Sequence, residues 1–171
     1  FDGGEKCTTP HLDEETIRQL FIKALNTINR EKTRILAGFE EIRDTAFETG
    51  ELEAEAWQLN GEMNVAAELI QKCIGENACV AQNQDEYAKR YDTLVKRFET
   101  AKARQEEVQA AITEKQAQRK MMENFMEVLR GLPEQVDYFD EAAWYAMVDF
   151  MTVYGKDDVR FTFKNGMEIK A

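Results

Sequence analysis

The sequence predicts a mainly α-helical protein, with a long antiparallel coiled-coil hairpin projecting from a small helical base and a short antiparallel β-sheet at the C-terminal end. Three observations lead to this prediction: a heptad-like apolar repeat within residues 51–108, apolar helical stripes on either side of it, and period-two alternation near the C-terminus. We therefore divide the chain into a base helix within 1–50, the coiled-coil arm and a second base helix within 51–130, and a short helix with strands that complete the base within 131–171.

The arm is predicted from apolar residues that alternate four and three positions apart, which is the period of a coiled-coil seam. They are Leu52, Ala56, Leu59, Met63, Ala66, Ile70 and Cys73 on the first half, and Tyr87, Tyr91, Leu94, Phe98, Ala101 and Val108, with the polar Gln105, on the second half. Folding the halves together about a turn near Val80 places Leu59 beside Ala101. The same register places Ile70 beside Tyr91.

The two halves of the hairpin also differ in charge. Residues 51–77 contain six acids and one base, whereas residues 85–104 contain six bases and four acids. This difference favours pairing between the halves over pairing of either half with a copy of itself. Because so long and thin an arm buries little apolar surface for its own stability, we expect it to serve as an interaction arm as well. The alternative is that it is only a scaffold.

Helices of the base are predicted on both sides of the arm. Asp13 fits an N-cap, and an apolar stripe follows it, made of Ile17, Leu20, Phe21, Ala24 and Ile28 and resumed by Ile35, Phe39, Ile42 and Ala46. Gly38 disfavours a single unbroken helix, and Gly50 ends the run. After the arm, apolar residues return at Met121, Met122, Phe125, Met126, Val128 and Leu129. We expect these to pack on the first helix before Gly131 and Pro133 end their own helix.

The C-terminal part changes from helical to strand-like patterning. A short helix is predicted around 141–150, followed by a strand over 151–154 and a turn over 155–158. Residues 159–163 alternate with period two, and Asn-Gly turns the chain into a last strand over 167–169. Three short strands are not stable alone, so we expect them to pack on the base helices.

Composition limits the partners of the chain. The formal net charge is −11, from 33 acids against 22 bases. Duplex binding needs a basic surface, so we do not expect this segment to hold nucleic acid on its own. No segment is long and apolar enough to span a membrane, and nothing resembles a signal peptide. Three cysteines favour a reducing, cytoplasmic location over a disulfide framework. Phe1 in place of an initiator Met predicts a piece of a longer protein.

No set of residues has the specificity of a catalytic site. His11 is the only histidine, serine is absent, and there is neither a Gly-rich phosphate loop nor a paired-cysteine motif. The many carboxylates are spaced as they are on solvated helix faces. We therefore predict no catalytic and no cofactor-binding residues within this sequence.

A zinc site is the one metal centre that the sequence suggests. Cys7 and His11 supply at most half of a four-ligand shell, and Cys73 and Cys79 lie roughly 40 Å away by helix rise. Either Cys7 is an ordinary thiol, or its co-ligands precede Phe1. We expect the segment alone to bind zinc weakly or not at all.

The turn of the hairpin is unusually apolar for an exposed loop. It carries Cys79, Val80 and Ala81 instead of a purely polar sequence. Exposed apolar residues at the end of an arm suggest a protein-contact surface, and we predict these three residues as its members. The alternative is that Val80 only closes the end of the seam.

Several stretches of the chain resemble a known family. They are CTTPHLDEETI at 7–17, FIKALN at 21–26, YAKRYDTL at 87–94, LPEQVDYF at 132–139, VDFMTVYG at 148–155 and VRFTFKNGMEI at 159–169. These stretches resemble large serine recombinases, from just after the zinc-ribbon cysteines to the strand pair that closes the C-terminal domain. The two ends of the chain carry the specific part of the resemblance, because coiled coils resemble one another easily.

The resemblance implies the C-terminal part of a site-specific DNA integrase or transposase of the resolvase–invertase type. Cys7 would be the last zinc ligand, and its partner ligands, the catalytic serine and most of the DNA-contacting surface would lie upstream. Arms of this family meet between subunits and control synapsis and the direction of recombination. We therefore expect other recombinase subunits as partners of the arm, and DNA as a partner of the parent chain. The alternative is a coiled-coil tether or adaptor with no nucleic-acid partner.

Overall fold

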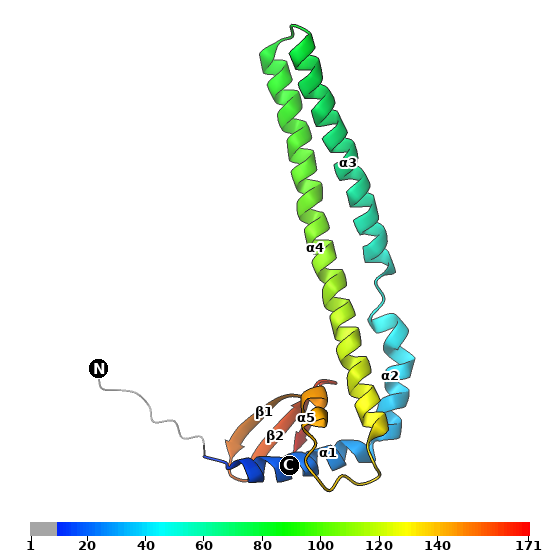
Figure 1. The fold of residues 1–171 in the computed structure, drawn as a ribbon, viewed down its shortest axis with the longest axis vertical. Helices are drawn as coiled ribbons and strands as arrows, with labels where there is room; N and C mark the ends of the chain where they lie inside the picture. Colours follow the sequence, from blue (N-terminus) through cyan, green and yellow to red (C-terminus); the bar gives the residue numbers. More distant parts are fainter. Residues whose placement is uncertain (1–9) are drawn as a thin grey trace, which may run out of the picture. The chain divides into compact units, whose positions relative to one another are not determined.

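The computed structural model describes residues 10–171, which are mainly helical with a small three-stranded antiparallel sheet near the C-terminus (Figure 1). The chain forms two compact units. The first combines the chain up to Ala46 with Gln118–Ala171, and the second is Phe47–Ala117. We describe each unit by itself.

The first unit begins with helices α1 (Glu14–Arg30) and α2 (Lys32–Ala46). The predicted N-cap is confirmed, because the Asp13 carboxylate accepts a hydrogen bond from the backbone N–H of Thr16 at 2.8 Å. The stripe is not one unbroken helix, as expected, but Gly38 lies inside α2 and the chain breaks at Glu31.

The break at Glu31 has a local hydrogen-bonding cause. The Glu31 N–H closes the last turn of α1 on the carbonyl of Ile28, and the Glu31 carbonyl then accepts the N–H of Ile35 to start α2. One glycine costs a helix only about 1 kcal/mol relative to alanine, so Gly38 does not interrupt α2.

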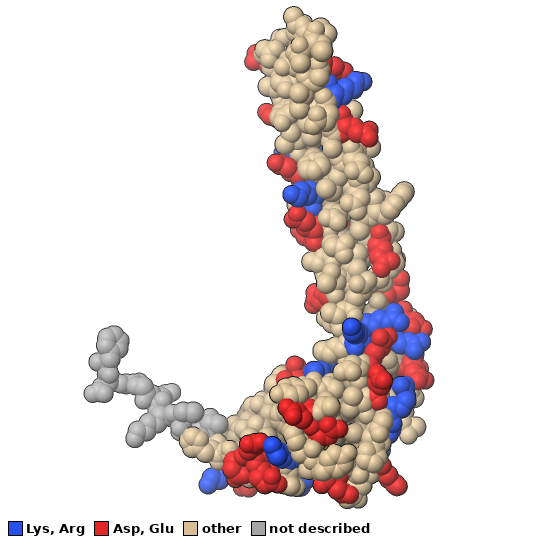
Figure 2. Space-filling model, viewed as in Figure 1, with Lys and Arg blue, Asp and Glu red and all other residues tan. Residues whose placement is uncertain are grey.

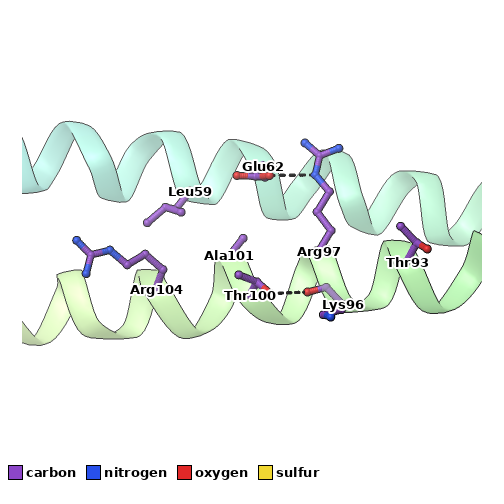
Figure 3. A pocket seen from close by; sticks show the side chains of 8 residues that line it. All are labelled: Leu59, Glu62, Thr93, Lys96, Arg97, Thr100, Ala101 and Arg104. Carbon is purple, nitrogen blue, oxygen red and sulfur yellow. Dashed lines mark hydrogen bonds and ion pairs between the residues drawn. The ribbon is translucent and has the colours of Figure 1, made fainter.

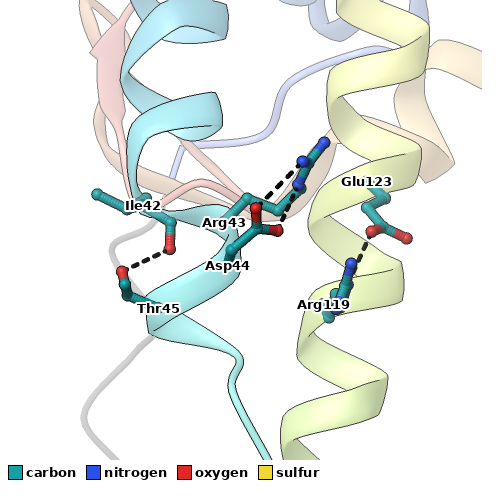
Figure 4. A network of polar contacts seen from close by, with 6 residues as sticks. All are labelled: Ile42, Arg43, Asp44, Thr45, Arg119 and Glu123. Carbon is teal, nitrogen blue, oxygen red and sulfur yellow. Dashed lines mark hydrogen bonds and ion pairs between the residues drawn. The ribbon is translucent and has the colours of Figure 1, made fainter.

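The prediction that the apolar stripe continues through α2 is wrong in part. Among Lys32–Ala46, all of which the structure describes, only Phe39 is buried, and Ile42 is 53% exposed. Figure 4 shows Ile42 pointing away from α4. Because α2 is a separate helix after the break at Glu31, its faces no longer follow the register of α1.

Near the end of α2, charged residues are found where the predicted stripe would have made an apolar contact. Arg43 and Asp44 are hydrogen bonded at 2.9 Å, and Arg119 and Glu123 of α4 form an ion pair at 2.9 Å (Figure 4). The Arg43 guanidinium lowers the pKa of the Asp44 carboxyl, and the positive charge of Arg119 adds to this effect. This part of α2 and α4 is therefore a solvated surface of the first unit.

Two asparagines on α1 hold the segment that follows α4 (Gln84–Gly131). Asn26 donates to the carbonyl of Val136 at 2.8 Å and accepts from its N–H at 2.9 Å. One turn later, Asn29 donates to the carbonyl of Pro133 at 2.8 Å. The return segment is therefore fixed to α1 through its backbone, an arrangement that apolar periodicity does not reveal.

The core of the first unit is an aromatic cluster. The Phe21 ring lies 5.0 Å from that of Trp144 and 6.1 Å from that of Phe161, and Trp144 and Phe161 meet edge-to-face at 5.8 Å. The first unit also fully buries Leu25, Ile28, Phe125, Leu129 and Met147. Of the apolar residues predicted to pack in the base after the arm, Phe125 and Leu129 are buried, whereas Met121 is 38% exposed.

The C-terminal elements are α5 (Glu141–Met147), β1 (Val148–Gly155), β2 (Asp158–Phe163) and β3 (Glu168–Lys170), with the strands in the order β1-β2-β3. The sheet agrees with the predicted one. The helix around 141–150 is too long, because β1 starts immediately after Met147.

Pairing explains this early start of β1 and the alternation along β2. Val148 pairs with Phe163 in the antiparallel register, so the strand begins where a β2 partner is present. Val159, Phe161 and Phe163 are buried on the face toward α1, and the residues between them are half-buried. The predicted Asn-Gly turn is confirmed, with Gly166 at a φ of 82°.

The second unit consists of α3 (Gly50–Cys79) and the part of α4 that runs back beside it in the opposite direction (Figure 1). The predicted helicity of 51–77 is confirmed, and the chain turns between Cys79 and Gln84, at the predicted position near Val80.

Burial in the second unit follows the predicted four-three spacing. All seven predicted seam positions on α3 and all seven on α4 are buried or half-buried. Ala56, Val108 and Ile112 form a buried cluster against which Leu52 and Leu59 pack. The two helices therefore bury one stripe each against the other, and knobs-into-holes packing within this contact stays a prediction.

Candidate interaction surfaces of the helix pair

The three predicted contact residues lie together at the α3–α4 turn. Cys79 ends α3, and Val80 and Ala81 follow it; all three are exposed, Val80 by 65%. In Figure 2 this end of the helix pair is mostly uncharged surface. Since two-thirds of Val80 faces solvent, it does not close the end of the seam.

Polar side chains of the turn face one another and leave the apolar ones outside. The Asn77 carboxamide oxygen accepts from the side-chain amides of Gln82 at 3.1 Å and Gln84 at 3.2 Å. Asn83 caps α4 by accepting from the Asp85 N–H at 2.9 Å. The turn is thus held by its own amides and by the Val80 N–H, which donates to the Glu76 carbonyl at 3.0 Å, whereas the Val80 side chain is not needed for this hydrogen bonding.

One edge of the helix pair carries ion pairs between α3 and α4. Glu55 meets Arg104 at 2.7 Å, and Glu62 meets Arg97 at 2.9 Å. A third pair, Glu76 with Arg90 at 2.8 Å, lies nearer the turn. The Glu55 carboxylate raises the pKa of Arg104, as does Glu107 on its own helix. The acidic residues of the first half and the basic residues of the second half therefore pair with each other, between α3 and α4.

A groove of about 430 Å³ runs along this charged edge (Figure 3). Leu59 of α3 and Ala101 of α4 both line it, in agreement with their predicted proximity, and Figure 3 shows Arg97 bonded to Glu62. The groove is open to solvent, and its walls carry no pair of side chains arranged for acid–base chemistry.

The face of α3 opposite the seam holds exposed apolar residues that the sequence analysis missed. Trp57 is 78% exposed and Val65 is 48% exposed, and Gly61 lies between them. The signal in the sequence was available: Trp57 is a large apolar residue that falls outside the four-three seam.

The predicted zinc ligand Cys7 lies outside the described residues. His11 is exposed, and within residues 10–171 no three His, Cys, Asp or Glu residues are grouped as metal ligands. Of the two cysteines in that range, Cys73 is buried and Cys79 is exposed. Zinc binding through Cys7 and upstream ligands stays a prediction.

Comparison with protein-family models, curated proteins and solved structures gives no match. The recombinase resemblance stays a prediction from the residues themselves. Among the helices of residues 10–171, none combines the length and the apolar character needed to cross a membrane.

Proposed function

We propose that this chain is the C-terminal part of a site-specific DNA recombinase of the large serine type, and that α3 and α4 form an antiparallel coiled-coil arm through which subunits contact one another. One observation carries the proposal: an exposed apolar turn, with Val80 at 65% exposure, ends a helix pair whose seam and charges are already matched internally. Such a turn has apolar surface left for a second protein.

In this proposal the arm controls synapsis of two attachment sites and the direction of recombination in the cytoplasm. The catalytic serine and most DNA contacts belong to upstream parts of the parent protein, where further ligands join Cys7 around zinc. The turn is small, so a contact made there alone is weak and transient. Two DNA-bound subunits raise the local concentration of their arms, which strengthens such a contact without adding surface.

A coiled-coil tether or adaptor is the second candidate, and the net charge of −11 favours it. An acidic chain gives no electrostatic footprint for nucleic acid. The sequence upstream of Phe1 separates the two candidates. A Cys-x-x-Cys pair preceded by a serine-recombinase catalytic domain supports the recombinase, and their absence from the parent reading frame supports the tether.

The decisive experiment places a charge on the turn of the full-length recombinase. Val80→Asp and Cys79→Asp are expected to leave single-site DNA binding unchanged and to impair the paired-site complex in a gel-shift assay, because a carboxylate there must be desolvated on contact. Ile42→Asp is the matched control, since it adds the same charge to another exposed apolar residue. If both turn variants synapse normally, subunits do not meet through the turn.

A further inference from the structure

Trp57 is exposed in a way that the helix pair does not explain. It lies within α3, away from both ends, and is 78% exposed on the face opposite the seam. Val65, about two turns further along, is 48% exposed. Tryptophan is the residue most enriched where protein partners bind tightly, because it buries a large area with few rotatable bonds.

Gly61 lies on the same face, one turn after Trp57, and the chain itself gives no reason for a glycine there. The described glycine with a positive φ is Gly166, so the backbone at Gly61 suits any residue. A Cβ added at Gly61 would meet no atom within 4 Å. A glycine inside a helix is destabilising relative to alanine. We therefore look for the role of Gly61 outside the single chain: the missing side chain leaves a notch on the helix that can admit a side chain of a neighbouring molecule.

We propose that Ala54, Trp57, Gly61 and Val65, here called the Trp57 face, pack against the Trp57 face of a second copy with the two α3 helices antiparallel. A two-fold axis between Trp57 and Gly61 places each tryptophan in the notch of the other copy. The same axis places Val65 against Ala54 of the second copy. Large residues meet small ones at each position, which is what a self-complementary two-fold interface requires.

The charges of α3 fit the antiparallel arrangement. Lys72 is the only base in the sequence of α3, and helical periodicity places it on the same side as Trp57. Its side chain is 67% exposed, and its carboxylate partner Glu76 is 3.9 Å away. In the dimer, Glu68 faces Glu51 of the second copy, and Lys72, one turn beyond Glu68 on the same helix, offsets the repulsion between those two carboxylates.

This inference rests on the proposed function and adds a second contact surface to the turn. The Trp57 face is small, so the free proteins associate weakly and the contact gains strength only when two subunits are held close together. A second copy is favoured over another partner because the projecting side chain and the notch occur on one face, one turn apart.

Sedimentation velocity over a range of protein concentrations tests the association. Trp57→Ala is expected to weaken self-association about tenfold or more, without loss of helicity, because the side chain is exposed in the single copy. Gly61→Leu is expected to raise the melting temperature, since leucine favours helix over glycine, and yet to abolish association by filling the notch. Opposite effects of one substitution on folding and on association cannot arise from misfolding.

Gly75→Leu is the matched control. Gly75 also lies in α3 with no atom within 4 Å of an added Cβ, but the two-fold register leaves it beyond the second α3 helix. This variant should be stabilised like Gly61→Leu and should associate like the original protein. Loss of association in both variants would overturn the register.

Disulfide trapping tests the antiparallel direction. In a background with Cys7 and Cys79 replaced by Ala, the single variants Ala54→Cys and Val65→Cys are expected to form a mixed disulfide dimer when combined. A parallel pair would instead cross-link Ala54→Cys with itself and would contradict the proposal. Self-association that survives both Trp57→Ala and Gly61→Leu, or no self-association at any concentration, overturns the Trp57 face. In the latter cases synapsis that is still lost in Val80→Asp leaves the proposed function standing.

Discussion

The two units of the molecule are stabilised in different ways. In the first unit, Phe21, Trp144 and Phe161 meet as a compact group of rings, with centroids 5.0–6.1 Å apart. In the second unit, the buried residues are small or aliphatic and are spread along the seam; they are Ala56, Ala66, Cys73, Ala101, Val108 and Ile112. Stability is concentrated in one place in the first unit and distributed in the second.

This difference bears on function. A concentrated core draws large side chains from every element around it, although Tyr138, Tyr145 and Phe150 of the first unit stay exposed. A two-helix seam uses one stripe of each helix and leaves the remaining faces open, as Trp57 and Val65 illustrate on α3.

The largest effect is expected in the aromatic core. Phe161→Ala should lower the free energy of unfolding of the first unit by about 3–5 kcal/mol, because Phe161 is fully buried and its removal opens a cavity beside the Phe21 ring. Urea unfolding followed by near-ultraviolet circular dichroism measures this. Phe150→Ala is the control, since Phe150 is 53% exposed on the neighbouring strand. Equal losses in the two variants would mean that the core is not concentrated where we place it.

A smaller effect is expected along the seam. Leu59→Ala should lower the free energy of unfolding of the second unit by about 1–2 kcal/mol, at or below the lower end of the range for fully buried leucines, because Leu59 is only half-buried. The measurement is thermal unfolding followed at 222 nm. Val65→Ala, on the opposite face, serves as the control. An unchanged midpoint in Leu59→Ala would show that the seam does not hold the pair together.

The smallest effect expected is a loss of stability of the first unit at acidic pH. Hydrogen bonding to Arg160 lowers the pKa of Asp158 below its ordinary value of 3.8. A lowered pKa means that the ionised form stabilises the fold above pH 3.8, and that this contribution disappears as the pH falls through the folded-state value.

Asp158→Asn should therefore flatten the acid limb of the stability curve of the first unit, by a small amount because the pair is solvated. Asp157→Asn, at the neighbouring residue, is the control. Melting temperatures between pH 2 and pH 6 provide the test, and parallel curves for the original protein and Asp158→Asn would refute the assignment.

Periodicity explains what the sequence could predict. The four-three spacing of Leu52 to Val108 depends only on which residues avoid water, so it located both helices and their turn. The alternation of Val159, Phe161 and Phe163 located β2 in the same way. These patterns repeat, and each repeat adds independent support.

Features that depend on single hydrogen bonds or on unpaired surface could not be predicted this way. The break at Glu31 follows from local backbone geometry and not from the more conspicuous Gly38. Asn26 and Asn29 bind the backbone of a segment more than a hundred positions away in sequence, where any residue offers the same groups. Trp57 lies outside the repeat, and a search for the repeat passes over it.

The regular spacing of the buried positions also restricts the lengths that the helix pair can have. Removing seven residues from α3 and the facing seven from α4 brings the next buried positions into the same places, since two helical turns separate equivalent seam residues. Removing a single residue instead rotates everything beyond it by about 100° and turns the buried stripe out to water. The length of such an arm is therefore expected to change in paired steps of one heptad, about 10 Å at a time, while the turn with Val80 and the first unit keep their own structures.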